Sequence, residues 1–181
     1  MTESQITDAG LLHLQALTNL EDLHLDDTEI TNSGLVHVIR LSKLRRLRLD
    51  AKRIDDEGLR HISAMTNLRE LDLTRARIAD AALERLQSLT NLEILILAKS
   101  QVTDAGLEHL PTLTKLEKLN LDDTAITDAG LAHLKTLSNL QMLSVQDANV
   151  TREGVEELQR AIPKLQIWPP ANHFRRRDRP Q

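Results

Sequence analysis

Histidines are the residues of this 181-residue sequence whose spacing first suggests chemistry. Five of the seven recur at multiples of 24 residues, as His13, His37, His61, His109 and His133. Neutral imidazole is a common zinc ligand, so such a column is a candidate metal site. Helices carrying successive histidines would lie roughly 8–10 Å apart, and neighbouring rings would have to lean together to share an ion. We therefore predict that these histidines are solvated and bind no metal.

Paired aspartates are the second candidate for chemistry. They recur where strands are expected to end or helices to begin, as Asp26-Asp27, Asp55-Asp56 and Asp122-Asp123. On neighbouring strands about 4.8 Å apart, Asp26 and Asp50 would repel each other unless an Arg or a calcium ion lay between them. The spacing lacks the EF-hand pattern, and solvated turn carboxylates are the alternative interpretation. A metal-dependent hydrolase using these acids is the enzyme alternative, but we predict no enzyme, no metal and no cofactor.

Composition excludes several classes of protein. The chain has no Cys, which removes disulfides, thiolate metal sites and cysteine nucleophiles. No run approaches the roughly 18 apolar residues that span a bilayer, and the start MTESQITDAG lacks a signal-peptide layout, so we expect a cytoplasmic protein and no membrane partner. The whole chain carries −4, and residues 171–181 carry four Arg and one Asp, or +3, which leaves −7 for residues 1–170. An acidic body with one short basic run predicts no nucleic-acid partner.

The positions of these residues follow from a 24-residue repeat that runs without a gap from Ile6 to Val150. Within it, the apolar-x-apolar spacing of Leu23 and Leu25 is typical of a short strand with one buried face. The segment Gly-Leu-x-x-Leu that follows has helical spacing. Leucine must form the core, since the chain has one Trp, one Phe and no Tyr. Each repeat therefore predicts a strand, a turn and a short helix.

Expected helix starts recur with the same period. A capping side chain precedes most of them, at Thr31, Asp55, Thr103, Thr127 and Thr151. All six glycines occupy one position of the repeat, which excludes a glycine-rich phosphate loop and indicates a backbone site without room for a Cβ. The third repeat has Ala79 at the cap and Ala82 in place of Gly, so its helix should begin differently, with Asp80 as a candidate cap.

The segments LTNLEDLHLDDTEITNSGLVHV and LTKLEKLNLDDTAITDAGLAHL resemble the leucine-rich repeat pattern L-x-x-L-x-L-x-x-(N/C)-x-L. The resemblance covers about residues 6 to 170, and the I-T-D-A-G-L half is similar to the cysteine-containing subclass and its bacterial relatives. It implies an α/β solenoid: a right-handed curved stack with a parallel sheet on the concave face and short helices on the convex face. Such folds offer binding surfaces rather than catalytic sites.

One column departs from the family pattern. Where the family has Asn or Cys, this chain has Thr28, Lys52, Ala76, Ser100, Thr124 and Ala148. Alanine side chains cannot hydrogen-bond, so we expect no continuous polar spine from this column. The Thr/Ser column from Thr18 to Ser138 is a candidate for part of such a spine.

The sequence predicts one solenoid over residues 1–170. It comprises a half repeat at 6–16, six full repeats from Leu17 and a C-terminal cap at 153–170, followed by a basic, disordered tail at 171–181. The strand near 20–25 would then have an open edge, which predicts self-association through that edge or marginal stability at that end. We expect Pro169 and Pro170 to end the last strand and Trp168 to pack over the last repeat.

Outward strand positions form three ladders across the concave face. The first holds Asp22, Arg46, Glu70, Ile94, Lys118 and Met142. The second holds His24, Arg48, Asp72, Ile96, Asn120 and Ser144. The third holds Asp26, Asp50, Thr74, Ala98, Asp122 and Gln146.

The fourth repeat is unusual because its outward residues Ile94, Ile96 and Ala98 are all apolar. They predict the centre of a protein-binding site, with polar and charged neighbours at Arg46, Arg48, Glu70, Asp72, Lys118 and Asn120 and an apolar neighbour at Met142. We therefore predict a non-catalytic module that binds another protein through the concave sheet. The alternative is the recognition domain of a larger chain, such as a ligase adaptor or a bacterial effector.

Overall fold

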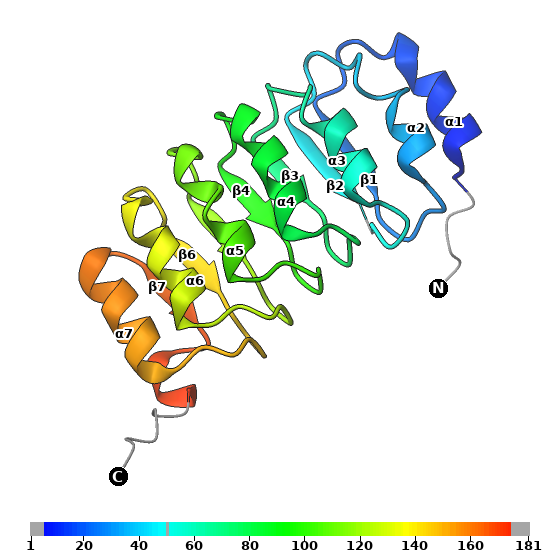
Figure 1. The fold of residues 1–181 in the computed structure, drawn as a ribbon. Helices are drawn as coiled ribbons and strands as arrows, with labels where there is room; N and C mark the ends of the chain where they lie inside the picture. The colour runs from blue at the N-terminus through cyan, green and yellow to red at the C-terminus, as the bar shows by residue number, and fades with distance from the viewer. Residues whose placement is uncertain (1–5, 50, 175–181) are drawn as a thin grey trace.

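A computed structural model describes residues 6–49 and 51–174, which form a curved stack of repeats (Figure 1). Seven parallel strands make one sheet in chain order. The strands are β1 (Asp22–Leu25), β2 (Arg46–Leu49), β3 (Glu70–Asp72), β4 (Ile94–Ile96), β5 (Lys118–Asn120), β6 (Met142–Ser144) and β7 (Gln166–Trp168). This is the leucine-rich repeat solenoid that the sequence predicted.

Short helices connect the strands and cover the other side of the sheet (Figure 1). The α-helices are α1 (Asp8–Leu12), α2 (Asn32–Leu35), α3 (Asp56–Ile62), α4 (Asp80–Leu83), α5 (Asp104–Leu107), α6 (Asp128–His133) and α7 (Arg152–Ala161). The 3₁₀ helices are η1 (His13–Ala16), η2 (Glu84–Ser88), η3 (Leu110–Thr112), η4 (Leu134–Thr136) and η5 (Ala171–His173). No described helix has both the length and the apolar character to cross a membrane.

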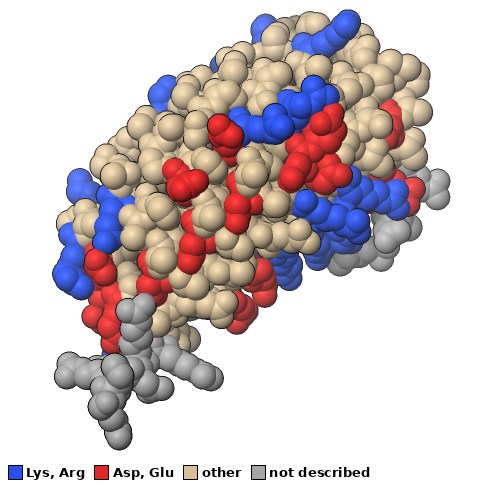
Figure 2. All heavy atoms as spheres, in the orientation of Figure 1, with Lys and Arg blue, Asp and Glu red and all other residues tan. Residues whose placement is uncertain are grey.

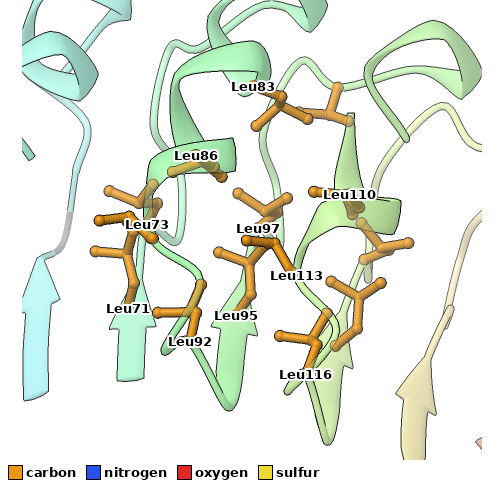
Figure 3. Close-up of a cluster of buried hydrophobic side chains, with 14 of the residues drawn as sticks. Leu71, Leu73, Leu83, Leu86, Leu92, Leu95, Leu97, Leu110, Leu113 and Leu116 are labelled. Atoms are coloured by element: carbon orange, nitrogen blue, oxygen red, sulfur yellow. The ribbon is translucent and has the colours of Figure 1, made fainter. Parts of the chain in front are cut away.

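Leucines fill the space between the sheet and the helices (Figure 3). Leu71 lies opposite Leu95 in the strand register, and Leu95 lies opposite Leu119. Leu95 and Leu97 are fully buried, so the inward face of β4 is the one that the alternation predicted. Stacked identical side chains let each repeat bury its apolar face against its two neighbours.

A ladder of aspartates joins the helix starts of successive repeats. Asp80, the first residue of α4, accepts hydrogen bonds from the backbone N–H of Thr103 at 2.7 Å and from its hydroxyl at 2.6 Å. The same two bonds join three other pairs: Asp8 to Thr31, Asp104 to Thr127 and Asp128 to Thr151. Each carboxylate thus satisfies a polar backbone group just before the next helix.

The repeats without this pair use substitutes. Asn32 donates its amide to the Asp55 carboxylate and accepts from the Asp55 backbone N–H. Asp56 accepts from the Ala79 backbone N–H at 3.0 Å. The sequence suggested Asp80 as a cap of α4, and this prediction is wrong. The Asp80 carboxylate binds Thr103 in the next repeat instead. Local caps form only in part, and Thr103 makes no side-chain cap bond.

The aspartate ladder explains the glycine column. A Cβ built on Gly106 would lie 2.6 Å from Oδ1 of Asp80 and 3.2 Å from its Cα. That space is already occupied by the carboxylate that binds Thr103. The glycine therefore leaves room for a side chain of the preceding repeat, and its φ angle is not positive.

A second ladder lies near the strand starts. The Asn67 amide donates to the Ser42 carbonyl at 2.7 Å, and Asn91 and Asn139 bind the Thr66 and Thr114 carbonyls in the same way. The Thr/Ser column contributes backbone carbonyls to this ladder. The Thr28 and Thr124 hydroxyls bond to carbonyls within their own repeats, so the Asn/Cys column does not join neighbouring repeats there.

The C-terminal end differs from the expectation. Ile167 takes the inward position of β7, so its neighbour Trp168 points outward and is 61% exposed. The prediction that Trp168 packs over the last repeat is therefore wrong. The strand does end before Pro169. Residues 171–174 form η5 and a bend in which Ala171 and Phe174 pack against the core, whereas residues 175–181 of the expected tail lie outside the described residues.

At the N-terminal end, the predicted half repeat forms α1 and η1 without a strand of its own. Leu11 is fully buried, and the backbone N–H of Glu29 donates to the Ile6 carbonyl at 3.1 Å. Within the described residues, β1 pairs only with β2. One edge of the sheet is therefore uncovered in this part of the chain.

We expect Gly106→Ala to destabilise the fold by about 1–3 kcal/mol, since the Cβ would displace a charged hydrogen-bond acceptor. Alanine ordinarily stabilises a helix interior by about 1 kcal/mol relative to glycine. A loss of stability in Gly106→Ala would therefore indicate the steric conflict with Asp80. Urea unfolding followed by circular dichroism measures the free energy of unfolding of each variant.

Gly10→Ala is the matched control, because its Cβ would meet Ile6 at an ordinary 3.5 Å. This variant should be neutral or slightly stabilising. Equal stability changes in the two variants would contradict the steric role of the aspartate ladder.

Candidate binding surface on the concave sheet

The outward residues of the seven strands form continuous ladders across the concave sheet. In the first, Ile94 lies between Glu70 and Lys118. In the second, Ile96 lies between Asp72 and Asn120. Strand β7 extends the two ladders with Gln166 beside Met142 and Trp168 beside Ser144.

The predicted apolar centre is present, although it is smaller than expected. Ile94 and Ile96 are each half-buried on the outward face of β4, on either side of the buried Leu95. Ala98 is only 8% exposed, so its prediction as a surface residue is wrong. It follows the end of β4, where the chain turns and where the Ala98 carbonyl accepts from Arg75.

The predicted rim on β2 is exposed, but its charges are already paired within the chain. The Arg46 guanidinium donates to the Asp22 carboxylate on the neighbouring strand. This hydrogen bond lowers the pKa of Asp22 below its usual value and raises that of Arg46. Arg48 lies 3.9 Å from Asp26 and 3.6 Å from Asp72, so an Arg does lie beside Asp26 as the sequence analysis required. Asp50, the other member of that expected pair, lies outside the described residues.

Asp72 is not the exposed rim residue that the sequence predicted. It is only 6% exposed, and its carboxylate accepts hydrogen bonds from the Thr74 backbone N–H at 2.9 Å and the Thr74 hydroxyl at 2.6 Å. These bonds hold the turn after β3. Glu70 remains half-buried on the first ladder.

The C-terminal half of the sheet carries the most exposed apolar side chains of the concave face. Met142 is 47% exposed and Trp168 is 61% exposed. They line one hollow of about 520 Å³ together with Ile96, and Asn120 and Ser144 complete its outward lining. Met142 is one of the site residues predicted from the sequence, whereas Trp168 is not. The signal for it was the apolar alternation of Leu165 and Ile167. If these two residues point inward, residue 168 must point outward.

A second hollow of about 640 Å³ borders the first near the strand starts. Lys118, Met142 and Gln166 line both hollows, and Lys164 lines the second. Lys118 and Lys164 are exposed, and neither forms an ion pair within the described part of the chain. These lysines differ in this respect from Arg46 and Arg48.

Polar groups at the strand ends near these hollows stabilise turns. Asp122 accepts from the Ser144 hydroxyl at 2.6 Å and the Gln146 backbone N–H at 2.7 Å. The Asn120 side chain accepts from the Asp122 backbone N–H at 2.8 Å. Asp122 therefore acts between β5 and β6 as a structural acceptor.

The histidine column lies on the helical side, away from the concave sheet. Three of its members are half-buried, which differs from the expected full solvation. The Nδ1 atom of His37 lies 2.8 Å from the Gln15 amide nitrogen of the preceding repeat, and Gln87 approaches His109 similarly at 3.4 Å. Among residues 6–49 and 51–174, no three His, Asp or Glu side chains are grouped as metal ligands.

Acidic side chains recur along much of the length of the molecule in the view of Figure 2, with basic side chains among them. This interspersed pattern is unlike the continuous basic stripe typical of nucleic-acid-binding surfaces.

Comparisons with known proteins place the chain in a family. The family model described as "FBD-associated F-box protein At5g56370, LRR repeats" matches residues 9–103, and a second model, "Leucine Rich repeat", matches residues 112–135. No curated protein sequence matches the chain. Among solved structures, internalin C2 from Listeria monocytogenes str. 4b F2365 is similar, with a TM-score of 0.67 and 25% identity over 91% of this chain and 77% of that one. The repeat, the sheet and these matches together show that the chain belongs to the leucine-rich repeat proteins.

Proposed function

We propose that this chain is a non-catalytic module that binds a protein partner through the concave surface of β4 to β7. The observation that carries the proposal is the hollow of about 520 Å³ that the outward side chains of Ile96, Met142 and Trp168 line, with Ile94 on the same face of β4. Exposed apolar patches of this kind, rather than single exposed residues, mark interaction sites. Tryptophan is also enriched among residues that dominate binding energy.

The paired charges on β2 have a different role in this proposal. Exposed ion pairs contribute roughly 0–1 kcal/mol, and Arg46 would have to leave Asp22 to contact a partner. We therefore assign the binding energy to β4 to β7, and the N-terminal strands to orientation of the partner. The alternative, that the chain is the recognition domain of a larger protein, is supported by a family model that describes the repeats of an F-box protein.

A second candidate is self-association through the N-terminal end. Leu12 and Leu17 are 50% and 48% exposed, and they lie in the segment that leads to the uncovered edge of β1. Unpaired backbone groups on an edge strand can pair with another chain.

The double variant Ile94→Asp, Ile96→Asp should abolish capture of a protein partner from the source lysate while shifting the melting temperature by only a few degrees. The reason is that both side chains lie on the outward face. A second variant, Met142→Asp with Trp168→Asp, should have the same effect with less structural cost, because these residues are more exposed. Quantitative mass spectrometry of the captured proteins measures the loss.

The matched control is Ala105→Asp with Ala129→Asp, which adds the same charge at exposed first-turn positions of α5 and α6. It should retain the partner. Equal capture by all three variants would contradict the assignment to the concave sheet, and unfolding of both concave variants would contradict the assigned strand faces.

We expect Arg46→Gln to raise the pKa of Asp22 toward its ordinary value, measured by NMR titration of the carboxyl carbon. In the native protein this pKa is lowered, so the stabilisation that the pair provides is present at neutral pH and is lost as the pH falls through the folded-state pKa. Arg60→Gln is the control, since Arg60 lowers the pKa of Glu57 instead. An Asp22 pKa unchanged by Arg46→Gln would show that the cross-strand pair is absent in solution.

Sedimentation velocity over a concentration series should detect reversible self-association that Leu12→Asp with Leu17→Asp removes. Charges at the open end would oppose docking of a second apolar end. Trp168→Asp, at the opposite end of the stack, should leave the association unchanged. A wild-type protein that stays monomeric throughout the series would exclude this candidate.

A further inference from the structure

We infer that the partner segment bound by the concave surface is acidic and carries a large apolar side chain beside its acidic residues. This inference rests on the proposed function and specifies the chemistry of the occupant. It comes from the charges that line the two hollows rather than from the repeat fold.

The floor of the site is apolar and sized for a side chain. Ile96, Met142 and Trp168 line a hollow of about 520 Å³ whose backbone is supported by the buried leucines of β4 to β6. An indole ring and a thioether next to each other accommodate aromatic or branched aliphatic groups. The floor therefore favours one large apolar residue of a partner.

The charges that line this floor have a single sign. Lys118 is the charged residue of the first hollow, and Lys118 and Lys164 are the charged residues of the second. Glu117, the nearest acidic residue along the chain, lines neither hollow. Since neither lysine forms an ion pair in the part of the chain that the structure describes, both ammonium groups are available to a partner.

A partner's carboxylates would gain two cations without breaking an existing pair, and this advantage is confined to the C-terminal half of the sheet. On β2, by contrast, an acidic segment would have to displace Asp22 from Arg46. Asp122 and the exposed Asp147 border the opposite, strand-end side. An acidic segment is thus attracted near the strand starts and repelled near the strand ends, which sets its position on the sheet.

Single-stranded nucleic acid is the other polyanion that lysines and an exposed tryptophan can bind. We favour a protein segment, because a phosphate backbone that crossed the sheet would also approach Asp122 and Asp147. A peptide can place its acidic residues at the lysine side alone.

The test uses Trp168 as its own reporter, since it is the chain's single tryptophan. Short peptides without Trp are titrated into the full chain while indole fluorescence is measured. One probe joins a Glu run to Phe, a second replaces Phe by Ala, a third replaces Glu by Lys, and a fourth probe is an oligothymidylate.

The Glu-Phe peptide should shift the fluorescence saturably and bind more tightly at low salt. Removal of Phe should weaken binding about tenfold or more, as expected for loss of a buried aromatic ring. In the variant Lys118→Glu, Lys164→Glu, the preference should invert so that the Lys-Phe peptide binds more tightly than the Glu-Phe peptide. The variant Lys43→Glu, Lys52→Glu, which changes exposed lysines outside both hollows by the same charge, should keep the wild-type preference.

Equal binding of the Glu-Phe and Lys-Phe peptides would overturn the inference, as would saturable binding of the oligothymidylate alone. A preference unchanged by the Lys118, Lys164 reversal would overturn it too. If the concave variants lose the captured partner as expected while the Glu-Phe peptide does not bind, the inference fails and the proposed function stands. If neither the captured partner nor any probe depends on the concave residues, both fail.

Discussion

The structure depends on one kind of contact between successive repeats: a side chain in the first turn of a helix binds the residue that precedes the following helix. That side chain is an aspartate everywhere except at Asn32. Asp80 and Thr103 show it most fully, with bonds to both the backbone N–H and the hydroxyl. The contact spans 23 residues, so an insertion or deletion inside a repeat would separate donor from acceptor. It also requires a residue without a side chain at Gly106, which accounts for a glycine column that turn geometry does not explain. Repeat length, helix start and, at Gly106, the absence of a side chain are thus all consistent with this one polar contact.

Because this ladder and the leucine core hold every repeat in the same register, neighbouring outward residues always meet as partners across strands. The chain uses this regularity in two ways. On β1 to β3, opposite charges meet and neutralise each other, as Asp22 and Arg46 do. On β4 to β7, apolar residues and lysines lie beside one another instead. Within the described chain, Met142 and Trp168 stay exposed, and Lys118 and Lys164 form no ion pair. The same scaffold therefore carries one half whose charges are paired within the chain and one half whose side chains are available to a partner.

The sequence was sufficient to predict what depends on short-range alternation. The inward positions of Leu95 and Leu97 and the outward positions of Ile94 and Ile96 follow from a period of two residues, and the structure confirms them. The errors lie where that alternation ends. Ala98 and Asp72 sit at or past the ends of their strands, where the chain turns, and burial there depends on contacts with the next residues.

Two further differences have physical causes that lie outside a single repeat. The sequence suggests Asp80 as a cap of its own helix, since first-turn acids ordinarily act there, whereas its hydrogen-bond partner, Thr103, belongs to the next repeat. Trp168 is expected from the sequence to pack over the last repeat as part of a C-terminal cap. Ile167 already fills the inward position of β7, and the ring is left on the concave surface.

The aspartate ladder also has a direction along the chain. Removal of a repeat from one end of the stack therefore has a different effect from removal at the other end. Each carboxylate serves the repeat that follows it, so loss of a repeat from the N-terminal end removes the acceptor from a helix start that stays behind. Loss from the C-terminal end removes donors and leaves a carboxylate that water can solvate. Residues 6–16 contain helices and no strand in the described part of the chain, yet Asp8 supplies the acceptor for Thr31. The half repeat thereby satisfies the polar groups at the start of α2. A half repeat that looks dispensable when only complete repeats are counted therefore has a structural role.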